Sequence, residues 1–403
     1  MAPTASRMNE AGSNADAPTE PRALRLRQLA WLFLKLGTIA FGGPAAHVAM
    51  MEDEVVRRRR WMTRERFLDL LGATNLIPGP NSTEMAIHIG YLRAGWSGLL
   101  LAGTCFILPA ALIVSGIAWA YVRFGALPQA LAVLYGIKPV IIAVVVQALW
   151  GLGKTAVKTR FLGFVAVGAL GASLLGVNEL AILFAGGMVV ALWRWAMERR
   201  HAGVSVFMPL LGTAAATAPV AAGVTFGLWP LFLVFLKIGS VLFGSGYVLL
   251  AFLRADLVER LGWLTEAQLL DAVAVGQMTP GPVFTTATFI GYVLGDGIGA
   301  LVATVGIFLP AFVFVALSGP LVPRIRRSKT AGAVLDGVNV ASLALMAAVT
   351  ISLARAAIVD VPTAVLALIA ALLLLLLRIN SAWLVLGGAG AGIASAYVLG
   401  LHD

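Results

Sequence analysis

Long apolar runs dominate this sequence and limit what it can fold into. The clearest examples cover residues 96 to 121, 127 to 150, 178 to 195 and 380 to 400. Each is close to the roughly 20 residues that a helix needs to cross a bilayer, and none shows the alternating pattern of a barrel strand. Hydrophobic residues make up 60% of the 403-residue chain and charged residues only 12%. The sequence therefore predicts an all-α integral membrane protein.

The rest of the composition narrows the class of function. The first 22 residues are polar and lack the apolar core of a signal peptide, so we expect a disordered cytoplasmic tail. The net charge of +10 reports loop orientation in a membrane protein and does not indicate nucleic acid. A single cysteine, Cys105, rules out an internal disulfide and a thiolate cluster, and no nucleotide-binding P-loop motif is present. We expect no metal and no cofactor.

An internal repeat organises the chain. The stretch "FLKLGTIAFGGP" at 33–44 matches "FLKIGSVLFGSG" at 235–246, and a Pro-Gly-Pro turn follows in each copy at nearly the same distance. Transporters commonly place a central site where two such repeats meet, although duplication can also simply enlarge a scaffold. The expected organisation is a tail at 1–22, transporter repeats at 23–204 and 227–403, and a linking transmembrane segment at 205–226.

The placement of Lys and Arg predicts that the second repeat is inverted. The arginine-rich stretch 57–66 corresponds to a stretch with only Arg254 and Arg260, whereas lone Arg123 corresponds to the basic cluster at 324–329. Because cytoplasmic loops hold the excess of positive charge, the bias changes sides between the halves. We expect an inner-membrane protein with about nine spans, four broken or re-entrant segments, a cytoplasmic N-terminus and an external C-terminus; full crossing of the broken segments would give about thirteen spans.

Four helix breaks form two pairs in the repeats. They are Gly42-Gly43-Pro44, Pro78-Gly79-Pro80, Gly244-Ser245-Gly246 and Pro280-Gly281-Pro282. Proline removes a backbone donor and ends the preceding helix, and inside a membrane the freed groups must line a cavity or be held by protein. Half-helices starting near Pro80 and Pro282 would turn their positive ends toward an anion, unless the breaks are plain kinks.

Polar side chains near the breaks complete the predicted anion site. Lys35 and Lys237 are repeat equivalents inside apolar segments, where a cation is a candidate for function, although snorkelling to the interface is an alternative. The substrate-binding prediction consists of these lysines with the break residues and their polar neighbours: Gly42, Gly43, Asn75, Pro78, Gly79, Pro80, Asn81, Ser82, Gly244, Ser245, Pro280, Gly281 and Pro282. Lys138 ranks lower because Asn339 replaces it in the second half.

Three titratable residues in the first half are candidates for proton coupling. Glu84 and His88 lie four residues apart on one predicted helix face, and His47 lies beside the first break. A carboxylate-imidazole pair can carry a proton, but a purely structural hydrogen bond remains an alternative. The corresponding second-half stretch offers only hydroxyls, so the two halves are specialised.

At these motifs the chain resembles the chromate ion transporter family in its two-domain form. The resemblance rests on "FLKLGTIAFGGPAAHVAMMEDEVV", "WMTRERFLDLLGATNLIPGPNSTEMAIHIGY" and "ILPA", with a degenerate second copy. It implies a secondary transporter that exports chromate, confers chromate resistance and is driven by the proton-motive force. Expected partners are chromate or a similar oxyanion, the lipid bilayer and a possible homodimer. A sulfate transporter, a non-transporting scaffold and a membrane-embedded enzyme stay open as alternatives.

Overall fold

The structure is a computed structural model that describes residues 20–41, 43–125, 127–201, 225–242, 248–377, 379 and 381–399. This part of the chain is helical and contains no strand, as the apolar runs predict. Most of the predicted linking segment lies outside the described residues, as do Gly42, Gly244 and Ser245.

The same order of helices occurs twice. The first half contains α1 (Arg22–Ile39), α2 (Gly43–Glu52), the π-helix η1 (Asp53–Arg58), α3 (Arg64–Thr74), α4 (Asn81–Phe124), α5 (Pro128–Ala156), α6 (Arg160–Leu174) and α7 (Glu179–His201). The second contains α8 (Leu228–Val241), α9 (Leu249–Leu253), the π-helix η3 (Arg254–Arg260), α10 (Glu266–Met278), the 3₁₀ turn η4 (Val283–Thr285), α11 (Thr286–Arg327), α12 (Lys329–Ala357), α13 (Val361–Leu376) and α14 (Ser381–Leu399).

Helix α4 is a hairpin of two antiparallel arms. Ala94 and Gly95 leave helical geometry, and Gly95 adopts a positive φ of 64°. The backbones of Gly90 and Gly98 then lie so close that a Cβ atom on either residue would clash with the other. Helix α11 turns in the same way, with Asp296 in the left-handed region at φ 52°. Each half therefore has a short arm folded back on a long one.

The helices on either side of the first Pro-Gly-Pro turn are too short to span a bilayer. Helix α3 has 11 residues, or about 16 Å, and the first arm of α4 ends before Ala94. Both fall short of the roughly 30 Å hydrocarbon core, so the turn at 78–80 lies between two half-helices, in agreement with the predicted broken segment. Among the described residues, five helices are long and apolar enough to cross a membrane: α4, α5, α7, α11 and α12.

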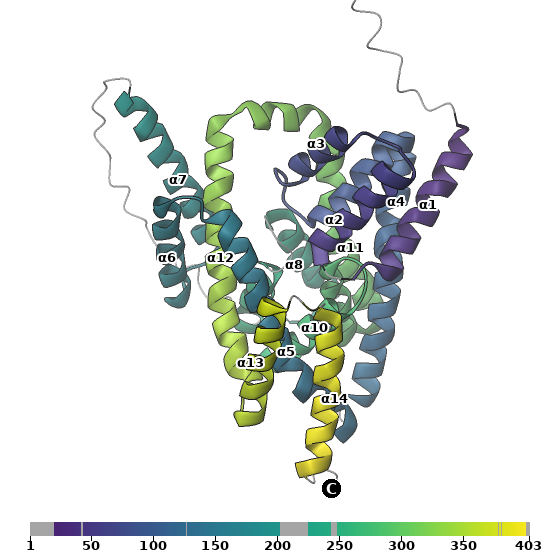
Figure 1. Cartoon of the computed structure of the whole chain (residues 1–403), viewed down its shortest axis with the longest axis vertical. Helices are drawn as coiled ribbons and strands as arrows, with labels where there is room; N and C mark the ends of the chain where they lie inside the picture. The colour runs from purple at the N-terminus through teal and green to yellow at the C-terminus, as the bar shows by residue number, and fades with distance from the viewer. Residues whose placement is uncertain are drawn as a thin grey trace, which may run out of the picture.

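The two halves run in opposite directions. The hairpin between α4 and α5 lies at one end of the molecule and the equivalent hairpin between α11 and α12 at the other (Figure 1). The described chain likewise begins at one end, with α1, and finishes at the other, with α14 (Figure 1). This arrangement is the predicted inverted-topology repeat.

The halves exchange their last helices. Helices α6 and α7 pack against α12, while α13 and α14 pack against α5. Glycines make this close approach possible: Gly186 of α7 lies against Gly337 of α12, and Gly136 of α5 lies against Gly388 of α14. Each half thus completes the packing of the other.

Candidate functional site

The two Pro-Gly-Pro turns are tied to opposite halves by a symmetric pair of hydrogen bonds. The amide of Gly79 donates to the carbonyl of Leu242 over 2.8 Å, and the amide of Gly281 donates to the carbonyl of Ala40 over 2.9 Å. Ala40 and Leu242 are the residues that end α1 and α8. Each turn therefore contacts the end of the first helix of the other half, just before that half's first predicted break.

Only glycine fits at the centre of each turn. Gly79 has a φ of 138° and Gly281 a φ of 85°, which residues with a Cβ atom rarely adopt. A Cβ atom on Gly281 would lie 2.5 Å from that of Ala110 and 3.0 Å from the carbonyl oxygen of Gly37, both in the first half. At Gly79 it would collide with the carboxyl of Glu84. The positive φ and these close contacts explain why the turns carry glycine.

The first turn of α4 presents free backbone donors. Pro80 caps the helix without a side-chain hydrogen bond, and its carbonyl accepts from the amides of Thr83 and Glu84. Within the described part of the chain, the amides of Asn81 and Ser82 have no acceptor. Such amides and the helix dipole together favour an anion.

Asn75 closes the turn from the other side. Its Oδ1 accepts from Nδ2 of Asn81 over 2.7 Å, across Pro78 and its neighbours. Of the remaining predicted break residues, Gly43 begins α2 with a φ of 77°, and Pro280 and Pro282 are buried. The asparagine pair thus stabilises the loop that aims the α4 half-helix.

His47 joins the first break to this half-helix. Its Nε2 lies 3.1 Å from the carbonyl oxygen of Ala40 and must donate to it, so Nδ1 faces the hydroxyl of Ser82 at 3.4 Å. The imidazole is buried and packs edge-on against Phe106, with ring centroids 5.8 Å apart. Ala40 therefore accepts hydrogen bonds from both His47 and Gly281.

Glu84 and His88 are both buried. Among the described residues, the two carboxyl oxygens of Glu84 and Nε2 of His88 have no hydrogen-bond partner. No hydrogen bond joins the two side chains in this part of the chain. Glu84 is completely buried and contacts Gly79. An unpaired charge at such a place is costly, so this carboxyl is a candidate for exchanging a proton and not for a permanent ion pair.

The equivalent hydroxyls in the second half already form hydrogen bonds within that half. Thr285 donates to the carbonyl of Pro282 and Thr286 to that of Val283, both over 2.8 Å. Thr288 is hydrogen-bonded to Thr304 over 2.7 Å. In the described contacts these threonines serve the local structure, whereas the first half keeps unpaired polar atoms.

Both predicted lysines are paired within their own half. Lys35 lies 2.8 Å from Glu54 in η1, and Lys237 lies 2.5 Å from Asp256 in η3. The lysines remain more than one-third exposed, while the carboxylates are less than one-tenth exposed. Although burial opposes it, hydrogen bonds from Lys35 and Arg59 hold the pKa of Glu54 below its usual range. Neither acid was among the predicted site residues, although the repeat places Glu54 opposite Asp256.

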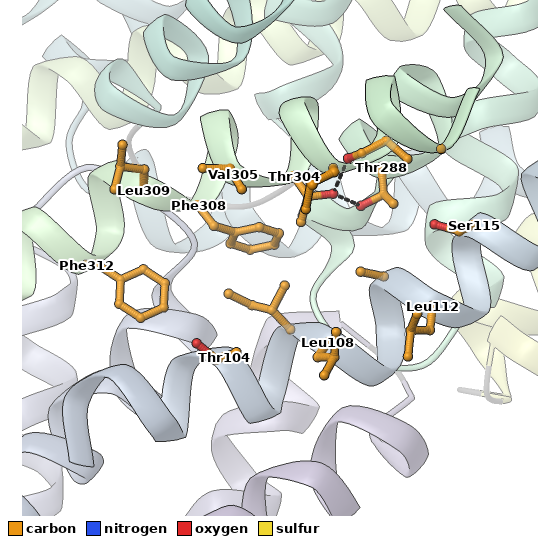
Figure 2. A pocket seen from close by; sticks show the side chains of 15 residues that line it. Thr104, Leu108, Leu112, Ser115, Thr288, Thr304, Val305, Phe308, Leu309 and Phe312 are labelled. Atoms are coloured by element: carbon orange, nitrogen blue, oxygen red, sulfur yellow. Dashed lines mark hydrogen bonds between the residues drawn. The ribbon is translucent and has the colours of Figure 1, made fainter. Parts of the chain in front are cut away.

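A separate cavity of about 390 Å³ lies between the long arms of α4 and α11 (Figure 2). Apolar side chains line most of it, and two of them, Leu108 and Leu112, are 47% and 64% exposed. Its hydroxyls come from Thr104, Ser115 and the bonded pair in α11 (Figure 2). An apolar lining without a cation fits hydrocarbon chains better than an oxyanion, so this cavity is not the predicted anion site.

Comparison with known proteins shows which protein family the chain is similar to. The model of the chromate transporter family matches two regions, residues 27–192 and 229–393, one in each half. The chain is 36% identical over 401 residues to the "Chromate transport protein" of Cupriavidus metallidurans, covering 97% of both chains. It is 35% identical to the protein of that name from Pseudomonas aeruginosa, over 86% of both chains.

A cyanobacterial relative extends the comparison. The "Probable chromate transport protein" of Synechococcus elongatus is 31% identical over 354 residues, which cover 86% of this chain and 89% of the relative. No solved structure matches the chain.

Proposed function

Because this chain belongs to the chromate transporter family, we propose that it carries chromate, a tetrahedral dianion, out of the cytoplasm across the inner membrane. This transport would confer chromate resistance and would be driven by the proton-motive force. The family is one of multi-pass membrane transporters, and the helices of this chain fit that class.

The crossed hydrogen bonds from Gly79 and Gly281 carry the proposal. They join each Pro-Gly-Pro turn to the end of the first helix of the other half, and secondary transporters bind substrate where two inverted repeats meet. The free amides of Asn81 and Ser82 and the hydroxyl of Ser82 would donate to the oxyanion. Rocking of the halves against each other would expose this region alternately to each side.

The predicted lysines and break residues complete the proposed path. Lys35 and Lys237 supply positive charge, and each is held in place by its carboxylate. A dianion passing these sites gains from the cations, while Glu54 and Asp256 prevent it from binding too tightly to leave. The proposed contacts also include Gly42, Gly43, Gly244 and Ser245 at the first break of each half.

Proton coupling in this proposal belongs to the first half. Glu84 lies beside the Pro-Gly-Pro turn with no partner in the described structure, and His47 contacts both breaks. Protonation of Glu84 would remove a negative charge next to the anion site, so the protonation of this carboxyl would be coupled to the occupancy of the site. His88, one turn further along α4, is the next group to which the proton could pass.

Chromate uptake into everted membrane vesicles tests the proposal. In everted vesicles export becomes uptake, so protein-dependent accumulation of labelled chromate that increases with an imposed proton gradient is the expected result. Vesicles without the protein are the control. Excess sulfate in the same assay separates a chromate-selective carrier from a general oxyanion carrier. Absence of protein-dependent uptake under all gradients would contradict the proposal.

A further inference from the structure

An ion-paired cluster inside the molecule joins the two halves away from the Pro-Gly-Pro turns. Lys138 of α5 lies 3.0 Å from Oδ1 of Asp271 in α10, and the hydroxyl of Tyr121 in α4 donates to Oδ2 over 2.9 Å. Asp271 is 5% exposed and Lys138 20% exposed. Two donors from the first half therefore hold one carboxylate from the second.

The first-half members of the cluster, Lys138 and Tyr121, lie on helices that are long and apolar enough to cross a membrane. Lys138 follows the start of α5 by ten residues, or about 15 Å along the helix, which is about half of the hydrocarbon thickness. Residues 269–276 of α10 are all buried. Ionisable groups at such a place are expensive and mark ion or proton pathways by default.

The repeat does not supply the lysine of this cluster a second time. The repeat places Asn339 at the position of Lys138, and Asp69 at the position of Asp271. Asp69 is exposed whereas Asp271 is buried. Contacts that only hold the fold together, such as the glycine pairs, occur in both halves. A contact that the repeat does not duplicate indicates a role that differs between the two sides of the membrane.

We propose that Asp271 is a second proton-coupling carboxyl, held by Lys138 and Tyr121 until it binds a proton, and this rests on the proposed transport function. A proton that adds to an oxygen of Asp271 cancels its charge and its attraction to Nζ of Lys138. Helix α10, which leads into the second Pro-Gly-Pro turn, is then released from α5. Pro139, directly after Lys138, interrupts the hydrogen bonding of α5 and allows it to bend there.

Other charged groups around α10 do not compete for Asp271. Helices α4, α5, α11, α12 and α14 and the turns η3 and η4 pack against it. On these elements, Glu84, His88, Arg123, Lys154, Asp296 and Arg355 make no hydrogen bond or ion pair with Asp271 among the described contacts. Other charges with described side chains on these elements pair elsewhere: Arg93 with Glu20, Arg254 with Glu259 and Glu266, Asp256 with Lys237 and Arg260, and Asp336 with Lys158 and Arg194.

Two transport measurements on Asp271→Asn test the inference. The first measures exchange of labelled for unlabelled chromate across vesicles without a proton gradient, and the second measures gradient-driven accumulation. Asn mimics the protonated carboxyl, so exchange should continue and the stimulation by the gradient should be lost. Asp336→Asn is the matched control, because Asp336 is also paired with a lysine, and it should behave as the wild type.

Tyr121→Phe supplies a milder variant that keeps the ring packed against Phe289. Removal of the Tyr121 hydroxyl, which donates to the carboxylate, should change the pH dependence of accumulation. An unchanged pH profile would overturn the inference. So would Asp271→Asn that still responds fully to the gradient, or a folded Asp271→Asn that also loses exchange. Absence of exchange in the wild type would contradict the transport function itself.

Discussion

At the scale of single residues, the buried carboxyl of Glu84 distinguishes the two halves. Its equivalent in the second half is Thr286, whose hydroxyl donates a hydrogen bond to the carbonyl of Val283. We expect Glu84→Gln to abolish chromate transport, because the amide keeps the size of the side chain but cannot exchange a proton. Vesicle uptake measures the loss, and an unchanged elution profile in detergent shows that the protein folds. Normal uptake by folded Glu84→Gln would assign this residue a structural role.

Lys35 poses a second question at this scale, because its ammonium is paired with Glu54. The pair is partly exposed and Arg59 also contacts the carboxylate, so its loss should cost about 1 kcal/mol of stability or less. We expect Lys35→Ala to abolish transport while the protein still reaches the membrane. The double variant with Glu54→Gln should stay inactive, since the cation is still missing. Recovery in the double variant would show that Lys35 serves the ion pair alone.

At the scale of elements, the Pro-Gly-Pro turns depend on glycine. In Gly281→Ala a positive φ costs about 1–2 kcal/mol, and the new methyl group clashes with Ala110 of α4. We expect this variant to lower the melting temperature in detergent and to lose transport. Gly116→Ala in the long arm of α4 is the control, because a Cβ atom there meets open space. Equal melting temperatures for the two variants would contradict this account of the turn.

At the scale of the whole molecule, the inverted repeat predicts which loops face each side. The hairpins α4–α5 and α11–α12 lie at opposite ends (Figure 1), and the second carries the basic cluster. In a Cys105→Ser background, we expect Thr330→Cys to react with an impermeant thiol reagent only from the cytoplasm and Leu127→Cys only from outside. Both positions are exposed. Labelling of both from one side would contradict the inversion.

The local parts of the fold and of the candidate site could be predicted from the sequence. Apolar runs, helix-breaking prolines and a repeated order of motifs act over a few residues, so the all-α class and the breaks at 42–44 and 78–80 followed directly. The proximity of Glu84 to the first turn followed in the same way, because only four residues separate it from Pro80.

The partners of the charged groups could not be predicted in this way. The sequence predicts Lys35 and Lys237 as unpaired cations, because the carboxylates that pair with them lie 19 residues away, across a helix break. Asp271 lies in a short helix of modest polarity, and its partners Lys138 and Tyr121 belong to the other half of the sequence. No local pattern marks such contacts.

The sequence by itself determined a duplicated helical membrane protein with paired helix breaks, because hydropathy, proline geometry and charge bias are properties of short segments. Only the tertiary structure decided that each Pro-Gly-Pro turn bonds to the opposite half, that α6–α7 and α13–α14 are exchanged between halves, and that Lys138 meets Asp271. These contacts depend on how two inverted halves pack, and packing between distant segments is determined by shape and burial over the whole chain.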